Sequence, residues 1–480
     1  MGRWRPMRVK LGFLVAFFFT TLPVVAVRAD DTHADFPRPA GLESQVRFWR
    51  QIFVEYSVHQ VVLHDAVHLD KVYKVLDFRP ELDDGMSPLR VERLQRTETD
   101  LELERIHNTL LRLHSLGGAV DGLSSDERRI YDMFADDSSP DRFLVAADDK
   151  HLRAQRGLRE RFAEGIRVSR RYLPEMERIF REDGLPPELT RLPLVESCFN
   201  LHAYSKVGAA GIWQFMPATG RRFLRVDNLV DERRDPIFST RAAARFLDEM
   251  HDSLGAWPLA ITAYNHGPEG VARAVGQCGT RDIATIVRDY HGSAFGFASR
   301  NFYAEFLAAL DVERNYREYF GNMPVEAAPR TREHRLDRAL GIQQAAHMAH
   351  ADRDVLATLN PSLSSLVLAG RRPIPRGARL RLPEGGASGF ETRLAEAPVE
   401  ERVVEHKVTP AVARHAAHAG RVRPAVLTYR VQRGQTLSHI AKRYRVSVAS
   451  LCTTNGIGKT GRLRPGQTLR IPRGVRRSAA

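Results

Sequence analysis

The chain has 480 residues, of which 43% are hydrophobic and 27% charged. This composition excludes a largely disordered chain, and the length exceeds what one hydrophobic core usually supports, so about two to four domains are expected. The net charge of +14 is segregated, because residues 321–480 carry a net +17 and residues 30–320 a net −8. A basic C-terminal part suits an anionic cell envelope, nucleic acid or solubility alone.

Residues 1–29 have the pattern of a secretory signal peptide. A basic start is followed by an apolar run over 11–27 and by small residues before Asp30. A retained membrane anchor is the alternative, because the run is near the minimum length for spanning a bilayer. No cysteine lies near the expected cleavage site, so no lipid anchor is expected. The sequence predicts a periplasmic or secreted, cell-wall-associated protein.

Residues 30–150 are predicted to form a helical N-terminal region without a chemical motif. Apolar residues recur at helical spacing over 42–65 and over 89–114, and Ser125 suits the start of a third helix. We expect this region to brace the next domain or to space it from something else.

Residues 151–320 are predicted to form a second helical domain. Helical periodicity over 152–190 is interrupted by a Gly-Leu-Pro-Pro segment at 184–187 and resumes in the helix that carries Glu196. No strand-like alternation intrudes over 152–316. The domain should therefore be mainly α-helical.

Two later helices complete this domain. Ser239 and Thr240 suit the cap of a helix over 241–251, and a last helix is expected over 299–312. Between them, a further helix runs into a turn that carries Tyr264 and other polar side chains.

Glu196 is the candidate for acid chemistry. It lies beside the apolar residues Leu194, Val195 and Phe199, ahead of a segment rich in glycine and aromatic residues. Desolvation raises the pKa of a carboxyl group, and such an acid can protonate a glycosidic oxygen near neutral pH. Taken without further context, most glutamates are ordinary acids on a helix surface.

Most glycosidases use two carboxylates, so a partner for Glu196 is needed in a conventional mechanism. The candidates are Asp227, Asp231, Glu232 and Asp235, all of which suit a turn before a capped helix. A single-acid mechanism therefore fits the residues better.

A set of residues at fixed spacing surrounds Glu196 and continues downstream. They are Glu196-Ser197, Phe199, Ala203, Ser205, Gly208-Ala209, Gly211, Trp213 to Pro217, Thr219-Gly220 and, downstream, Ala263-Tyr264-Asn265. These positions resemble the signature of the lytic transglycosylase family, of the membrane-bound lytic murein transglycosylase D type. The resemblance implies a lysozyme-like helical domain of the SLT type that acts on peptidoglycan glycan strands without a cofactor or metal ion.

The resemblance also implies roles for individual residues. Glu196 would be the general acid and then the general base, and the 2-acetamido group of N-acetylmuramic acid would assist the departure of the leaving sugar. Its 6-hydroxyl would then attack the anomeric carbon, which gives a 1,6-anhydro end. The implied substrate-binding residues are Ser205, Gln214, Met216, Tyr264 and Asn265. One departure is that Phe302 stands where many relatives have a tyrosine, with Tyr303 one residue later.

The three cysteines are Cys198, Cys278 and Cys452. An odd number excludes a closed disulfide framework in an exported protein, and whether Cys198 and Cys278 pair is left open. A nucleophilic Cys198 is disfavoured, because no histidine-bearing motif accompanies it.

The segment 426–473 reads strand, helix, helix, strand and resembles a LysM module, a family that binds N-acetylglucosamine-containing glycans. A weaker, degenerate copy is expected over 335–384, where the opening strand and turn motif are missing; an independent helical linker is the alternative. The segment 385–425 is expected to be an exposed linker. Its histidines, His406, His415 and His418, are expected to be solvated rather than metal-bound.

These features favour an exported peptidoglycan lytic transglycosylase held at the wall by LysM. A lysozyme-type hydrolase on the same fold and a non-catalytic wall-binding scaffold are the alternatives. Nucleic acid is disfavoured as a partner because export is expected, and envelope proteins are further candidate partners.

Overall fold

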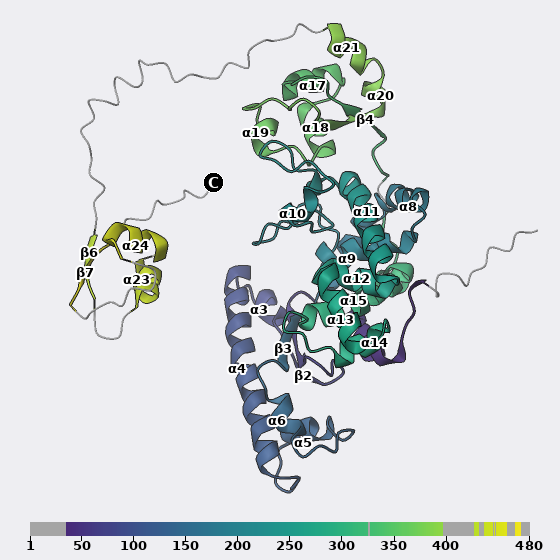
Figure 1. Cartoon of the computed structure of the whole chain (residues 1–480). Helices are drawn as coiled ribbons and strands as arrows, with labels where there is room; N and C mark the ends of the chain where they lie inside the picture. Colours follow the sequence, from purple (N-terminus) through teal and green to yellow (C-terminus); the bar gives the residue numbers. More distant parts are fainter. Residues whose placement is uncertain are drawn as a thin grey trace, which may run out of the picture. The chain divides into compact units, whose positions relative to one another are not determined.

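The computed structural model describes residues 35–324, 327–396, 427–431, 436–444, 446, 448–457 and 466–471. The chain divides into two units, Met1–Ala397 and Pro398–Ala480 (Figure 1). The expected signal peptide and the three linker histidines lie outside the described residues. In the part that is described, no helix is both long and apolar enough to cross a membrane. The mainly α fold class is confirmed.

A three-stranded antiparallel sheet lies at the centre of the N-terminal region. The strand order is β2 (Val72–Asp77), β1 (Gln60–Asp65), β3 (Leu152–Arg156). The long helix α4 (Pro88–Ser115) lies against β1 and β3 (Figure 1). Shorter helices complete the region: η1 (Ala40–Leu42), α3 (Arg79–Asp83), α5 (Ser125–Asp132) and α6 (Arg142–Ala146).

The helix expected over 42–65 is wrong in its second half. Helix α2 (Glu43–Val54) ends early, and β1 follows with Val61, Val62 and Leu63 buried. Consecutive β-branched side chains pack well on a pleated sheet and are stiff in a helix, which explains the switch. Strand β3 likewise corrects the expectation of no strand over 152–316.

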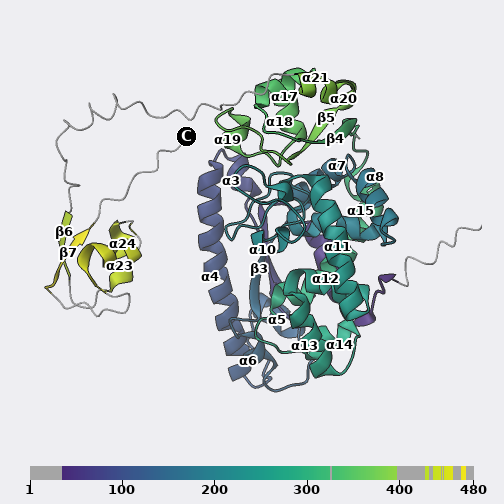
Figure 2. The same ribbon diagram turned by 45° about the horizontal axis from the view of Figure 1, so that its top comes forward.

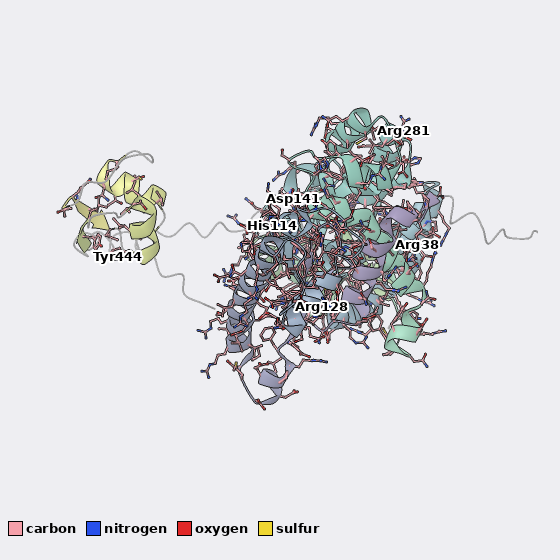
Figure 3. All side chains as sticks on the ribbon, turned by 90° about the horizontal axis from the view of Figure 1, so that it is seen from below. Arg38, His114, Arg128, Asp141, Arg281 and Tyr444 are labelled. Carbon is pink, nitrogen blue, oxygen red and sulfur yellow. The ribbon has the colours of Figure 1, made fainter. Side chains whose placement is uncertain are left out.

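Helix α2 is part of the main helical core of the first unit. It packs along α15 (Phe297–Arg314), where the Trp49 indole donates a hydrogen bond of 3.2 Å to Asn301 Oδ1. The guanidinium group of Arg38, labelled in Figure 3, lies 2.5 Å from the carboxylate of Asp311, which is also on α15. The N-terminal segment therefore completes the hydrophobic core around α15.

The remaining helices of this helical core surround α15 and α12 (Trp257–His266). All of them except α10 and η3 contribute side chains to the same hydrophobic core as α2. They are α7 (Arg159–Ser169), α8 (Leu173–Glu182), η2 (Pro187–Arg191), α9 (Leu192–Ser197), α10 (Pro217–Gly220), η3 (Glu232–Arg234), α11 (Pro236–Leu254), α13 (Pro268–Cys278), α14 (Ile283–Asp289) and α16 (Tyr316–Phe320).

Helix α11 begins five residues before the predicted start. The carboxylate of Asp235 caps it by accepting hydrogen bonds of 2.9 Å from the backbone N–H groups of Ile237 and Phe238. Ser239 and Thr240, the expected caps, lie inside the helix and donate their hydroxyl protons to backbone carbonyls one turn back. An aspartate followed by proline is a strong helix start, and it prevails over the later hydroxyl pair.

A small βααβ module follows the helical core. Strands β4 (Thr331–Arg335) and β5 (Arg379–Pro383) pair antiparallel, with α17 (Ile342–Met348) and α18 (Arg353–Leu359) between them, followed by an additional single-turn helix, α19 (Ser365–Leu368) (Figure 2). An opening strand is therefore present, upstream of the expected boundary. The first part of the expected linker is helical, as α20 (Glu384–Ala387) and α21 (Phe390–Glu396). Phe390 and Leu394, one turn apart, bury themselves in the core of the module.

The second unit has the same element order except that it has no counterpart of α19 among its described residues. Strands β6 (Leu427–Arg430) and β7 (Thr468–Ile471) pair antiparallel, and α23 (Leu437–Tyr444) and α24 (Val448–Asn455) lie between them in the chain. The strand-helix-helix-strand order predicted for this segment is confirmed.

Candidate active site

Glu196 lies near the end of α9, a six-residue helix whose inner face is buried through Leu192 and Leu194. The helix stops because Cys198 and Phe199 both adopt left-handed backbone conformations, with φ of 47° and 52°. Two such residues in succession turn the chain sharply. The turn leaves Glu196 at the wall of a cavity of about 790 Å³.

The Glu196 carboxyl group is half-buried and accepts no hydrogen bond from the residues that the structure describes. Burial raises the pKa of Glu196 to about 8. The group is therefore protonated at neutral pH and can act as a general acid. The predicted direction of the pKa shift is confirmed.

The rate of any reaction that uses Glu196 as an acid should fall as the pH rises through about 8. The pKa is raised, so the reactive protonated form is present below this value and is lost above it, about tenfold per pH unit. Initial rates of that reaction, measured between about pH 4 and 9.5, check this. A rate that falls above pH 5, as expected for an unshifted carboxyl group, would contradict it.

Tyr264 lies on α12 within electrostatic reach of Glu196. Burial, and then the charge of Glu196, raises the pKa of Tyr264 well above its usual value. Its hydroxyl donates a hydrogen bond of 2.8 Å to the carbonyl of Trp213. The structure therefore brings Tyr264 close to the predicted acid and joins it to the aromatic loop.

Asn265 follows Tyr264 at the exposed end of the helix. Its Oδ1 accepts a hydrogen bond of 3.0 Å from the hydroxyl of Ser299, at the start of α15. Ser299 also lies 3.2 Å from His266 Nδ1. Ser299 was not predicted from the sequence, and it orients the Asn265 amide so that the amide nitrogen is directed away from the Ser299 contact.

The loop over 203–217 contains three further predicted residues. The hydroxyl of Ser205 accepts a 2.9 Å hydrogen bond from the backbone N–H of Ala209 and closes a tight turn. Gln214 has a left-handed backbone, with φ of 48°, and its Nε2 donates to the carbonyl of Gly211 at 2.7 Å. Met216 is 42% exposed. These contacts fix the shape of the loop.

Ser197 connects this loop to the acid. Its hydroxyl is 3.0 Å from the carbonyl of Ile212 and 3.2 Å from that of Pro193. Because Ser197 directly follows Glu196, a shift of the loop would be transmitted to the acid. The sequence motif contains Ser197, but its bridging role depends on a contact that the fold makes.

The five predicted binding residues do not line the Glu196 cavity itself. Its walls come from α7 and from the turn after α9, and the lining residues are Arg161, Glu164, Val168 and the run 195–202. The roles of Ser205, Gln214, Met216, Tyr264 and Asn265 toward a sugar therefore stay predictions.

A second carboxyl group, missed in the sequence, lies near Glu196. Glu305 is half-buried on α15, which packs against α9. Burial raises the pKa of Glu305 to about 8, and the charge of Glu196 adds to the shift. Like Glu196, it accepts no hydrogen bond from the described part of the chain. At neutral pH this group is mostly uncharged.

The acids weighed as partners have structural roles instead. Asp227 accepts backbone hydrogen bonds within its own turn, and Asp231 pairs with Arg233 at 2.7 Å. Glu232 and Asp235 are buried in ion pairs with the βααβ module. The structural interpretation of all four is confirmed.

Tyr303 does not replace the missing tyrosine at position 302. Its buried hydroxyl donates a 2.7 Å hydrogen bond to the carbonyl of Pro37 in the N-terminal segment. Cys198, Cys278 and Cys452 form no disulfide among the described residues, and burial raises the pKa of the Cys198 thiol to about 11, which makes it a poor nucleophile.

Two family models match the chain. Residues 177–287 match the transglycosylase SLT domain, which contains Glu196, Ser205, Gln214 and Tyr264. Residues 429–472 match the LysM domain. The chain therefore carries an SLT-type domain joined to a LysM domain.

The chain is similar to the membrane-bound lytic murein transglycosylase D of Escherichia coli K12. The two are 31% identical over 302 residues, which cover 61% of this chain and 62% of that protein. The same figures hold for the protein of E. coli O6:H1. The chain thus matches slightly less than two thirds of the length of these relatives.

Two solved structures share a partial likeness. One is an inactive mutant of lytic transglycosylase Slt from Pseudomonas aeruginosa, at 22% identity and a TM-score of 0.26, over 47% of this chain and 38% of that one. The other is the 70 kDa soluble lytic transglycosylase from E. coli, at 17% identity and a TM-score of 0.25, over 48% and 44%. Scores this low do not establish a common overall fold.

Proposed function

We propose that this protein is a peptidoglycan lytic transglycosylase. It would cleave the β-1,4 bond between N-acetylmuramic acid and N-acetylglucosamine and leave 1,6-anhydro ends. The observation that carries the proposal is Glu196, a desolvated carboxyl group with a pKa near 8, within the residues that match the SLT domain.

The reaction needs one acid that later becomes a base. The Glu196 carboxyl donates its proton to the glycosidic oxygen as the bond from that oxygen to the anomeric carbon breaks. The 2-acetamido group supports the positive charge that develops at this carbon. The resulting Glu196 carboxylate then takes the proton of the 6-hydroxyl as O6 bonds to the anomeric carbon, so no water is consumed and the acid is restored.

The neighbouring residues would position the sugar. Tyr264, anchored on the Trp213 carbonyl, and Asn265, oriented by Ser299, would hydrogen-bond near the acetamido group. The carbonyl oxygen of Gln214 accepts no hydrogen bond from the described residues and would take one from a sugar hydroxyl. Such positioning accounts for a large part of the rate in reactions of this type.

A lysozyme-type hydrolase is the second candidate, because Glu305 supplies a second carboxyl group near Glu196. A conventional glycosidase needs its second carboxylate in the charged form, either to attack carbon or to activate water. Burial raises the pKa of Glu305 to about 8, so this group is mostly neutral at pH 7. Glu305 is therefore poorly suited to that role, and the transglycosylase is favoured.

A non-catalytic wall-binding scaffold is disfavoured by the same desolvated acid. Burying a carboxyl group lowers the stability of the fold above its ordinary pKa, and glycan binding alone does not require it. The LysM match supports retention at N-acetylglucosamine-containing wall polymers, which would raise the local substrate concentration. A periplasmic or wall-associated location is part of the same proposal.

Product analysis of digested sacculi tests the proposal. Mass spectrometry should show muropeptides with 1,6-anhydro ends, about 18 Da lighter than hydrolysis products because no water is added. The Glu305→Gln variant should give the same products, since Glu305 does not act as a charged catalyst. Reducing ends from the wild type, together with loss of activity in Glu305→Gln, would support the hydrolase instead.

A further inference from the structure

The βααβ module over 331–383 and the LysM segment share one internal clamp. In the first, Asn360 donates to the carbonyls of Leu356 and Arg381 and accepts from the Arg381 backbone N–H, at 2.7 to 2.9 Å. In the second, Asn455 makes the same three bonds, to the carbonyl of Leu451 and to both backbone groups of Arg470, at 2.7 to 2.8 Å. The module over 331–383 is built as a copy of the LysM segment.

The shared clamp aligns the closing strands of the two copies. Arg381 corresponds to Arg470, so Arg379, two residues earlier, corresponds to Thr468. Side chains two residues apart point to the same face of a strand. The first copy therefore has two arginines on one face of β5, where the second has a threonine and one arginine.

Those two arginines reach buried acids of the helical core, which is called the catalytic core from here on because it carries Glu196. Arg379 forms two bonds of 2.8 Å with the carboxylate of Glu232, and Arg381 Nη2 lies 2.9 Å from Asp235 Oδ1. Glu232 is 4% exposed and Asp235 1%. Both guanidinium groups also lie over the ring of Phe238, at 3.9 and 5.1 Å. Buried acids in such pairs depend on their partners, because removing one leaves an uncompensated charge.

Backbone contacts continue the same interface. The backbone N–H of Asp231 donates to the Ser362 carbonyl at 2.8 Å, and that of Ser364 donates to the Leu229 carbonyl at 2.9 Å. The side chain of Val230 is buried in the hydrophobic core of the module. The segment 229–235 of the catalytic core is thus seated in the first LysM-like copy.

The seated segment holds the loop of the candidate active site. Arg233 Nη1 donates hydrogen bonds to the carbonyls of Gly208 and Phe215, at 2.7 and 2.8 Å. These two bonds connect distant positions of the loop to one side chain. Gly211 packs directly on the Arg233 backbone. Arg233 lies between Glu232 and Asp235, so a displacement of these acids would move the groups that fix the loop.

We propose that the module over 331–383 has the chain's own catalytic core as its partner, and that Arg379 and Arg381 are positioning residues for the loop over 205–217. They act through Glu232, Arg233 and Asp235 and do not touch substrate. The module then serves as a brace for the active site, while wall binding falls to the C-terminal LysM domain. The expected effect on kcat rests on the proposed function, whereas the expected effect on the order of the loop over 205–217 does not.

The test uses the full chain with Arg379→Gln, Arg381→Gln and the double variant. Arg372→Gln is the matched control, because Arg372 is exposed on the same module. Hydrogen–deuterium exchange should rise about tenfold or more in peptides covering 205–217 of the double variant and stay unchanged in the control. The value of kcat should fall about tenfold or more while KM changes less than about threefold. A double lysine variant, which keeps both charges, should recover most of the exchange protection.

Wild-type exchange in the loop of the double variant would overturn the proposal, as would an equal rise throughout unit one. If the double variant does not fold, the Arg379→Gln variant alone decides between the same outcomes. If the wild type releases no anhydro products, the proposed function fails, but the exchange measurement still decides whether the arginines position the loop.

Discussion

Replacing Glu196 with Gln is expected to reduce muropeptide release from sacculi by about a thousandfold or more. Glutamine keeps the size of the side chain but cannot donate or accept the proton that the reaction transfers, and general acid–base catalysis is worth about 10² to 10⁴ in rate. Glu305 is not expected to take over, because it lies on another helix, α15, and is not among the residues that line the Glu196 cavity. Chromatography of the released muropeptides with mass detection gives the rate.

The matched control is Glu182→Gln, because Glu182 is exposed on α8 and pairs only with Arg178 among the residues described. It should keep the wild-type rate. Thermal unfolding shows whether Glu196→Gln still folds, and it should be more stable than the wild type above about pH 8. The folded-state pKa of Glu196 is raised, so the wild type loses stability as the pH rises from about 4.5 through 8. Wild-type release by this variant would show that Glu196 is not the catalyst.

The candidate acid could be predicted because its environment is local. Leu194, Val195 and Phe199 lie within three residues of Glu196, so their apolar character already indicates desolvation, and the structure bears out the direction of the pKa shift. Helix α4 was predicted to within one residue at each end, because the apolar residues of a long helix recur with a period that is visible in the sequence alone.

The residues that could not be predicted act across long stretches of chain. Glu305 looks like one polar position on an ordinary buried helix until α15 is packed against α9. The ion pair between Arg381 and Asp235 joins the βααβ module to the helical core, and neither residue belongs to a sequence motif that predicts the other as its partner. Asp235 shows this limit most clearly. The neighbouring residues predict that it lies in a turn, whereas in the folded chain it caps α11 and forms a buried ion pair with Arg381.

The prediction of a helix over the residues of β1 failed for a different reason. A short run of apolar residues fits a helix or a strand, and only the partner strands decide between them. Here β2 and β3 flank β1 on both sides, and β3 arrives from residue 152 onward. The sheet therefore overrides a helical pattern that continues smoothly from α2.

The Gly211→Ala variant is expected to destabilise the first unit by about 3 kcal/mol or more and to displace the active-site loop. Gly211 has a φ of 75°, a left-handed conformation that costs an L-residue about 1–2 kcal/mol. An added Cβ would also overlap the carbonyl oxygen of Arg233, and relief of such overpacking costs about 1–3 kcal/mol more. Urea unfolding followed by tryptophan fluorescence measures the change, because Trp213 is buried in the same loop.

Gly184→Ala separates the two terms of that cost. Gly184 has nearly the same φ, 74°, at the end of α8, but a Cβ there would meet no atom within 4 Å. It should therefore lose only the conformational term, about 1–2 kcal/mol, and keep the wild-type rate of muropeptide release. Equal losses in the two variants would mean that the Arg233 backbone yields freely to the new methyl group. The segment 231–235 would then be too flexible to position the loop, which would contradict a rigid connection from Glu232 and Asp235 to Glu196.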